Sequence, residues 1–352
     1  MALVQQEKIM FKLIVALAVF YGIAIYFKVR RKIILTILAL VFIFVLFLVL
    51  VLPETHFVII NIGSSFAELL LLTIIMLLIG AYSFILKKIK KKNIEKNADI
   101  KTGSEMSESE IERYARHIML KEIGGPGQQK MRDAKVLVIG AGGLGNPVSL
   151  YLAAAGVGTI GIIDHDEVSL SNLQRQILFC DEDIGISKVF ASQKNLSQLN
   201  PHIIIKPYNR ILDEKNAQNL IKEYDLVIDG TDNLNTRHLI NLACIGAEKP
   251  LISGAISQWE GQISLFDPKN NFPCYSCLFP KTDNDNMVKS CAEVGVLGSL
   301  PGVIGSLMAV EAIKEINGIG KSLRGFLILY DALNCEVRKV EAEKDPKCEI
   351  CN

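Results

Sequence analysis

The sequence predicts an α/β protein whose mainly parallel sheet carries helices on both faces, preceded by transmembrane helices. Two observations support the sheet: short apolar runs alternate with helix-length segments after residue 135, and a glycine-rich turn follows the first run. A third observation supports the membrane part, since half of the 352 residues are apolar and the excess lies before residue 90. A chain of this length is expected to form two or more structural units.

The N-terminal region, residues 1–92, is predicted to contain three transmembrane helices at about 9–27, 33–52 and 69–86. The second block is the most persuasive, because its twenty uncharged residues give about 30 Å of helix, enough to cross a bilayer core. A signal peptide is the weaker alternative for the first block, since no clear cleavage site follows it and a complete span comes directly after.

Positive charge around these blocks predicts their orientation. The loop 28–32 is basic, the loop 53–68 lacks Lys and Arg, and a lysine-rich run follows at 87–92. Because positively charged loops tend to stay in the cytoplasm, we expect a multi-pass membrane protein whose C-terminal domain is cytoplasmic. Residues 93–106 are polar and aperiodic, so they are predicted to be a linker.

Residues 107–352 are expected to form the α/β domain. Ser107 and Glu110 match a capping box at the start of a helix, and the glycines and proline of 124–127 are expected to break it. Helices are then expected at 147–155, 187–199, 214–223 and 236–247, and strands at 136–139, 159–163, 203–205, 226–228, 251–253, 261–266, 325–330 and 335–340.

A phosphate-binding turn is predicted where the first strand meets the first crossover helix. Gly140, Gly142, Gly143 and Gly145 permit a tight turn and let backbone N–H groups approach a phosphate at the helix N-terminus. Asp164 ends the next strand, where a carboxylate can accept hydrogen bonds from ribose hydroxyls. A close packing turn without a ligand is the alternative. The Rossmann-like order of strand, glycines and helix favours a nucleotide, and up to this point a dinucleotide-dependent dehydrogenase would look the same.

Charged residues at later strand ends favour a triphosphate over a dinucleotide. Arg175 and Lys188 bring cations toward the same edge of the sheet, and Asp232 follows a strand that ends in the sequence DGTDN. A carboxylate beside two cations and a phosphate cradle suits Mg²⁺ and ATP, whereas hydride transfer needs a nicotinamide pocket. Each residue alone is better explained as a solvated surface group, so the prediction depends on their combination.

Two CxxC pairs predict a metal site. All eight cysteines lie from Cys180 onward, and Cys274, Cys277, Cys348 and Cys351 form pairs with the spacing of a tetrahedral four-cysteine zinc site. Four thiolates fill the coordination sphere, so such a Zn²⁺ ion would be structural and would tie the C-terminal residues to the middle of the domain. The pattern also favours a reducing compartment over secreted disulfides.

Cys291 stands apart from these pairs, in the polar segment KSCAE. A partly exposed cysteine near Lys289 is a candidate reactive thiolate. Buried packing is an equally good interpretation of the sequence alone.

The motifs RYARHIML, GAGGLG, IIDHDEVSLSNLQRQ, DGTDN, PCYSC, GVIGSLMAVEAIK and CEIC together resemble the ThiF/MoeB/HesA family, relatives of ubiquitin-activating enzymes. The chain is most similar to the molybdopterin-synthase and thiamine-biosynthesis adenylyltransferases. The resemblance extends from about Glu110 to the end of the chain. The three predicted spans are not part of the usual pattern of this family.

The resemblance implies ATP-dependent adenylation of the C-terminal Gly-Gly of a small ubiquitin-like sulfur carrier, for molybdopterin- or thiamine-type biosynthesis. It also implies roles for individual residues. In a homodimer, Arg116 would reach the phosphates bound by the partner subunit, and Cys291 lies where some relatives accept the activated acyl group or sulfur. The nucleotide-site roles implied are phosphate contact by Gly143, ribose binding by Asp164, triphosphate stabilisation by Arg175 and Lys188, Mg²⁺ binding by Asp232, and weaker contributions from Asn172 and Arg237.

Partners and alternatives complete the prediction. The expected partners are the carrier, a second copy of the chain, the membrane and a separate sulfur donor, because the terminal CEIC motif leaves no room for the sulfurtransferase domain of some relatives. A net charge of +1 gives no reason to expect nucleic acid. Three alternatives stay open: adenylation of a peptide or tRNA-linked carboxylate, an NAD-dependent oxidoreductase, and a non-enzymatic membrane scaffold.

Overall fold

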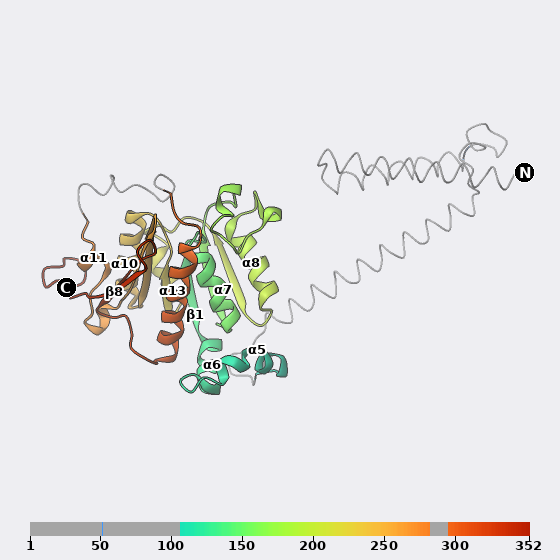
Figure 1. Cartoon of the computed structure of the whole chain (residues 1–352), viewed down its shortest axis with the longest axis horizontal. Coiled ribbons are helices and arrows are strands. Elements are labelled where there is room, and N and C mark those ends of the chain that lie inside the picture. The colour runs from blue at the N-terminus through green and yellow to red at the C-terminus, as the bar shows by residue number, and fades with distance from the viewer. Residues whose placement is uncertain (1–50, 52–105, 282–294) are drawn as a thin grey trace, which may run out of the picture. The chain divides into compact units, whose positions relative to one another are not determined.

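The computed structural model describes Val51 and residues 106–281 and 295–352. The chain divides into two units, Met1–Asn97 and Ala98–Asn352, and the second contains every described residue except Val51. The described part of this second unit is organised on an eight-stranded sheet (Figure 1). Its elements in chain order are α5 (Glu108–Ile118), α6 (Gly124–Asp133), β1 (Lys135–Ile139), α7 (Gly145–Ala155), β2 (Thr159–Asp164), α8 (Lys188–Leu199), β3 (Ile204–Asn209), α9 (Ala217–Lys222), β4 (Leu226–Asp229), α10 (Leu234–Ala247), β5 (Leu251–Ser257), β6 (Glu260–Phe266), α11 (Tyr275–Leu278), α13 (Leu300–Asn317), β7 (Phe326–Asp331) and β8 (Glu336–Glu341).

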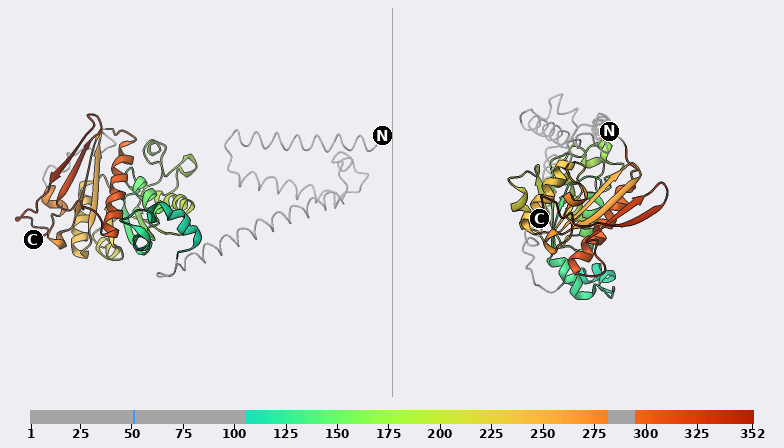
Figure 2. Two further views of the ribbon diagram at one scale, coloured as in Figure 1. Left: turned by 60° about the horizontal axis from the view of Figure 1, so that its bottom comes forward. Right: turned by 90° about the vertical axis from the view of Figure 1, so that its left-hand side faces the viewer.

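The strand order is β3-β2-β1-β4-β5-β6-β7-β8. The first five strands are parallel, and β6, β7 and β8 add to them in antiparallel fashion at one end of the sheet (Figure 2). Ile139 pairs with Ile163 on one side and with Asp229 on the other, so β1, β2 and β4 end at one edge. The predicted mainly parallel α/β fold is confirmed, and its strand ends lie together where open α/β sheets bind ligands.

Buried apolar side chains cover both faces of the sheet. Val136 and Val138 of β1 belong to one core cluster, which includes residues of α7, α8 and α13. Leu137 and Ile139 belong to a second cluster with residues of α9, α10 and α11. Alternate side chains of a strand point to opposite faces, so the uninterrupted apolar run of β1 is required by helices on both sides.

One local prediction was incomplete: the first helix ends before the glycines and proline of 124–127, but these residues also begin a second helix that was not predicted. The chain leaves α5 at Ile118 and begins α6 at Gly124, so Pro126 lies in the first turn of a new helix. Proline is tolerated there because the first N–H groups of a helix have no partner within it. The breaker therefore marks a helix start as well as a helix end.

The prediction of a multi-pass membrane protein with a cytoplasmic catalytic domain is corrected. Among the residues that the structure describes, no helix is both long enough and apolar enough to cross a membrane. The longest described helix, α13, carries Glu311, Lys314 and Glu315 and packs against α7 and the sheet. The proposed spans at about 9–27, 33–52 and 69–86 lie outside the described residues, apart from Val51.

Candidate functional site

The glycine turn joins β1 to α7 with backbone segments in close contact. Gly140 has a φ of +93°, which favours glycine. A Cβ atom on Gly145 would lie 1.9 Å from the carbonyl oxygen of Gly140, so no side chain fits there. Gly142 and Gly143 line the adjacent cavity. The turn therefore presents bare backbone at the N-terminus of α7, as an anion site requires.

Asp164 lies at the end of β2, beside this turn. One of its carboxylate oxygens accepts a hydrogen bond from the N–H of Ala141 at 2.7 Å, and the other accepts from the N–H of Asp166 at 2.8 Å. These bonds hold the carboxylate against the glycine turn, in the place expected of a ribose-binding group.

Lys188 begins α8 and directs its ammonium group toward the same strand end. Its side chain is 8% exposed, and Nζ lies 2.7 Å from a carboxylate oxygen of Asp166. Partial burial alone would raise the pKa of the Asp166 carboxyl, but the hydrogen bond and charge of Lys188 outweigh it and lower that pKa. The sequence reasoning missed Asp166, and its only signal was its position two residues beyond Asp164.

Arg175 and Asn172 lie in the loop between β2 and α8. Arg175 donates from Nη1 to the carbonyl oxygen of Ser171 at 3.0 Å, and Asn172 accepts from the N–H of Ser169 at 3.2 Å. A Cβ atom on Gly143 would lie 3.8 Å from Cδ of Arg175, so the arginine stem passes beside the turn. These loop contacts place a cation next to the phosphate cradle.

A cavity of about 900 Å³ brings the predicted nucleotide residues together at the carboxyl edge of the sheet. Asp232, which is exposed, enters it from the loop between β4 and α10. Sequence reasoning missed other walls of the cavity, including Arg210 after β3, Phe279 after α11 and Arg338 of β8. Of the predicted set, the residues that line the cavity are Gly140, Gly142, Gly143, Asp164, Asn172, Arg175, Lys188, Asp232 and Arg237, whereas Gly145 shapes the turn behind it.

The two CxxC pairs meet in space. The Sγ atoms of Cys274 and Cys277 are 3.7 Å apart, those of Cys274 and Cys348 are 3.7 Å apart, and those of Cys277 and Cys351 are 3.5 Å apart. Four sulfurs at about 2.3 Å from a tetrahedral Zn²⁺ would be separated by about 3.8 Å, so the cluster fits this ion. Burial raises the pKa of the Cys274 thiol to about 11, and a bound dication would reverse that effect.

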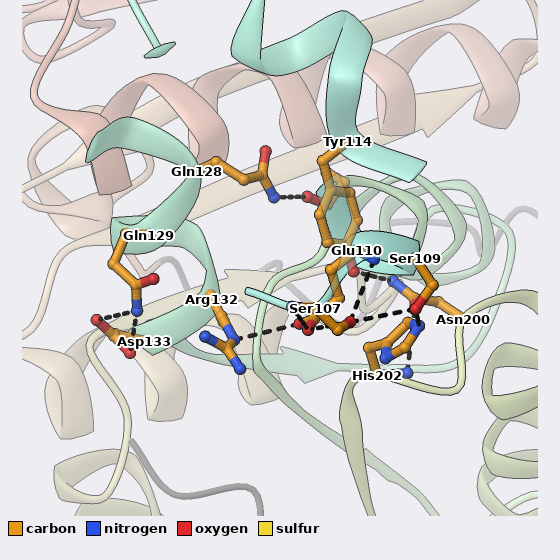
Figure 3. Close-up of polar contacts among 11 residues, drawn as sticks. Ser107, Ser109, Glu110, Tyr114, Gln128, Gln129, Arg132, Asp133, Asn200 and His202 are labelled. Carbon is orange, nitrogen blue, oxygen red and sulfur yellow. Dashed lines mark hydrogen bonds and ion pairs between the residues drawn. The ribbon is translucent and has the colours of Figure 1, made fainter. Parts of the chain in front are cut away.

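Arg116 does not line the cavity. It lies exposed in the last turn of α5, which is tied to the opposite end of α7. Tyr114 lies against Gly156 just after α7, and its hydroxyl accepts a hydrogen bond from Asn200 at 2.8 Å (Figure 3). The eleven residues of α7 span about 16 Å, so the helix separates Arg116 from its own glycine turn.

A partly buried polar cluster at the start of α5 fixes this helix to the domain (Figure 3). Ser107 and Glu110 form the predicted capping box. Glu110 also pairs with Arg132 of α6 at 3.2 Å, with both side chains at most 10% exposed. Such a cluster gives α5 a defined direction, and with it the direction of Arg116.

Cys291, the candidate reactive thiol, lies outside the described residues.

Comparisons with known proteins agree with this geometry. The model of the ThiF family matches residues 114–350. The sulfur carrier protein adenylyltransferase of Thermus thermophilus is 46% identical over 249 residues, which are 70% of this chain and 92% of the relative. The molybdopterin-synthase adenylyltransferase of Escherichia coli is 45% identical over 248 residues, 70% of this chain and 99% of the relative. A crystal structure of E. coli MccB with ATP is similar with a TM-score of 0.60 at 25% identity, over 68% of this chain and 74% of that chain.

Proposed function

This chain belongs to the ThiF family, and we propose that it uses ATP to adenylate the C-terminal Gly-Gly carboxylate of a small ubiquitin-like sulfur-carrier protein. The activated carrier would serve sulfur transfer of the molybdopterin or thiamine type. The observation that carries the proposal is the cavity in which a glycine turn, two cations and two carboxylates converge. The names of the relatives with 45–46% identity support the same reaction class.

The chemistry requires alignment and charge neutralisation rather than a general base. The carrier carboxylate is ionised at neutral pH, so one of its oxygens attacks the α-phosphorus of ATP directly. A bond forms between that oxygen and the α-phosphorus, the bond from this phosphorus to the β-bridging oxygen breaks, and pyrophosphate leaves with its electron pair. No proton is transferred, which explains why the site needs no Ser–His or Cys–His pair.

The proposed roles follow from where the side chains lie. The glycine turn would donate backbone N–H groups to phosphate, and Asp164 would accept from the ribose. Lys188 and Arg175 would stabilise negative charge on the triphosphate. Asp232, with its exposed carboxylate at the cavity, would hold Mg²⁺, which supplies further charge neutralisation when bound.

A second copy of the chain would complete the site. Arg116 is exposed, lies about one helix length from its own turn and is attached to a helix that is rigidly tied to the domain. Exposed apolar side chains on the neighbouring helices, such as Tyr151 of α7 and Val303 and Val310 of α13, offer a surface for association. A homodimer in which Arg116 reaches the partner's phosphates accounts for both features.

The four-cysteine cluster is proposed to hold one structural Zn²⁺ ion. Two of its cysteines are buried, and all four sulfurs are within 4.8 Å of one another, so no open position for a substrate is expected. The ion would tie residues 348–351 to α11, whose Tyr275 also lines the nucleotide cavity.

The experiment that tests the function is ATP–pyrophosphate exchange by the whole chain with carriers from the same cell. Exchange should require a carrier that ends in Gly-Gly, and the same carrier without its last glycine is the matched control. Asp232→Ala should abolish exchange. Failure of every such carrier to support exchange, with ATP binding intact, would refute the carrier assignment.

The remaining alternatives have distinct outcomes in the same assay. Exchange with a peptide or a tRNA-linked carboxylate, but not with a carrier, would change the assigned substrate while keeping the adenylation reaction. Tight NADH binding without ATP binding would favour an oxidoreductase, and full cellular function of Asp232→Ala would favour a scaffold. If Cys291 accepts the activated acyl group or sulfur, Cys291→Ser should lose sulfur transfer while it keeps exchange.

A further inference from the structure

A buried ion pair lies directly behind the Asp232 loop. Asp229, the last residue of β4, is 1% exposed, and the side chain of Arg237 on α10 is 7% exposed. The carboxylate oxygen Oδ2 of Asp229 lies 3.4 Å from Nη1 of Arg237 and accepts a hydrogen bond from Ser253 at 2.8 Å. Arg237 in turn donates from Nη1 to Ser253 at 3.1 Å. The pair thus joins β4, β5 and α10, with Asp229 and Ser253 in register on adjacent strands.

The pair holds every polar group of Thr231. Oδ1 of Asp229 accepts hydrogen bonds from the backbone N–H of Thr231 at 2.9 Å and from its hydroxyl at 2.7 Å. Nη2 of Arg237 donates to the carbonyl oxygen of Thr231. Thr231 is therefore fixed at its amide, its side chain and its carbonyl by two buried charges.

Asp232 stands between this fixed residue and a helix cap. Asn233, which follows it, caps α10 by accepting a hydrogen bond from the N–H of Thr236 at 3.0 Å. Within the described ranges 106–281 and 295–352, the Asp232 side chain makes no hydrogen bond or ion pair. Its direction is consequently set by the backbone on either side, and not by partners of its own.

The same loop is packed against the phosphate-binding turn. The N–H of Gly230 donates to the carbonyl oxygen of Ile139 at 2.9 Å. A Cβ atom on Gly230 would lie 3.1 Å from the nitrogen of Gly145. The loop therefore holds its carboxylate at a defined separation from the glycine turn.

We propose that Asp229 and Arg237 are positioning residues that act through Thr231 to hold Asp232 in register with the phosphate-binding turn. This proposal rests on the function proposed above, in which Asp232 binds Mg²⁺. A buried ion pair is a weak source of stability, because desolvation offsets most of its attraction. Charged groups behind a metal ligand instead orient that ligand, and their loss typically costs about 10- to 100-fold in metal affinity. Arg237, which the family resemblance associated with the nucleotide, acts here on the backbone of the Asp232 loop.

The test compares Mg²⁺ dependence of ATP binding in the whole chain, with no carrier present. In Asp229→Asn, Arg237 loses its counter-charge and is no longer held against Thr231. The Mg²⁺ concentration that gives half-maximal ATP binding should therefore rise at least tenfold. Binding of ATP in EDTA should stay within twofold of wild type, because the glycine turn is unchanged. Asp225→Asn is the matched control, since it makes the same change at the opposite end of β4, where Asp225 accepts from the N–H of Lys135.

Arg237→Lys keeps the positive charge but replaces the planar guanidinium, which has several N–H donors, with one compact ammonium group. This variant should shift the Mg²⁺ dependence in the same direction, and it keeps the test available if Asp229→Asn does not fold. Two results would overturn the proposal: folded variants whose half-maximal Mg²⁺ stays within twofold of wild type, or an Asp232→Ala variant with wild-type Mg²⁺ dependence. Because no carrier is used, a failed carrier assignment leaves this comparison decisive.

Discussion

Replacing Gly145 by alanine should destabilise the domain, although alanine is ordinarily the better helix former. Gly145 begins α7, and its ideal Cβ atom would lie 1.9 Å from the carbonyl oxygen of Gly140. Ordinary contact begins at 3.4 Å, so the two backbone segments would have to separate by about 1.5 Å. The Gly140 segment is held to the sheet, because the N–H of Gly140 donates to the carbonyl oxygen of Ile163 at 2.9 Å.

The magnitude follows from two opposing effects. Alanine gains about 1 kcal/mol over glycine in a helix interior. Overpacking a well-packed site costs about 1–3 kcal/mol or more, and a clash between two backbone segments belongs at the upper end. We expect a net loss of about 2 kcal/mol, which for a domain of this size lowers Tm by about 4–8 °C.

Thermal unfolding of the whole chain, followed by circular dichroism, measures this effect. Gly302→Ala is the matched control, because Gly302 lies in the first turn of α13 and its ideal Cβ atom meets nothing within 4 Å. The control should keep or slightly raise Tm. A Gly145→Ala variant that unfolds at or above the wild-type temperature would refute the steric reasoning. The variant should also lose ATP affinity, since the displaced turn no longer presents its N–H groups.

Three further predictions concern charge, pH and metal. Asp166→Asn should tighten ATP binding about threefold, because Lys188 no longer pairs with a competing carboxylate; weaker nucleotide binding in a fluorescence titration would contradict this. Burial would raise the pKa of Glu110, but hydrogen bonds from the helix cap and nearby positive charge outweigh burial and lower that pKa. The Glu110 carboxylate therefore stabilises the fold above its unfolded pKa of 4.5, and this stabilisation is lost as pH falls through the folded pKa. The free energy of unfolding, measured with urea between pH 7 and 3, should fall in wild type and fall less in Glu110→Gln. An equal fall in both proteins would argue against this role of Glu110. The wild-type chain should contain about one zinc ion, measured by atomic absorption, and Cys348→Ser should lose it. Cys335→Ser, which changes an exposed cysteine outside the cluster, should keep the ion.

The parts of this protein that follow from local chemistry could be predicted from the sequence. A capping box at Ser107 and Glu110 needs only two residues three positions apart, and the structure has it. Uninterrupted apolar runs such as that of β1 predict buried strands because both faces of the sheet are covered. The glycine turn is equally local, since the conformation of Gly140 and the contact at Gly145 arise within six residues.

Other features depend on which segments meet, and no local pattern encodes that. The pairing of Ile139 with Asp229 brings the Asp232 loop to the glycine turn across about ninety residues of chain. Asp166 and Asp229 gave only the weak signal of their position, because an acidic residue near a strand end is ordinary until a buried lysine or arginine is found beside it. The apolar N-terminal blocks predicted a membrane protein, whereas no helix in the described part of the chain can span a membrane.

By itself, the sequence determined most of the strands and crossover helices, although not α6 or α13, and it also determined which glycines must stay glycines and that four cysteines have metal-ligand spacing. The tertiary structure alone decided that Arg116 lies away from its own cavity and that Arg237 works through the backbone of Thr231. The physical reason is the same in both cases. Periodicity, capping and turn chemistry act within a few residues, whereas the direction and partner of a charged side chain depend on the register of strands and the packing of helices that are distant in sequence.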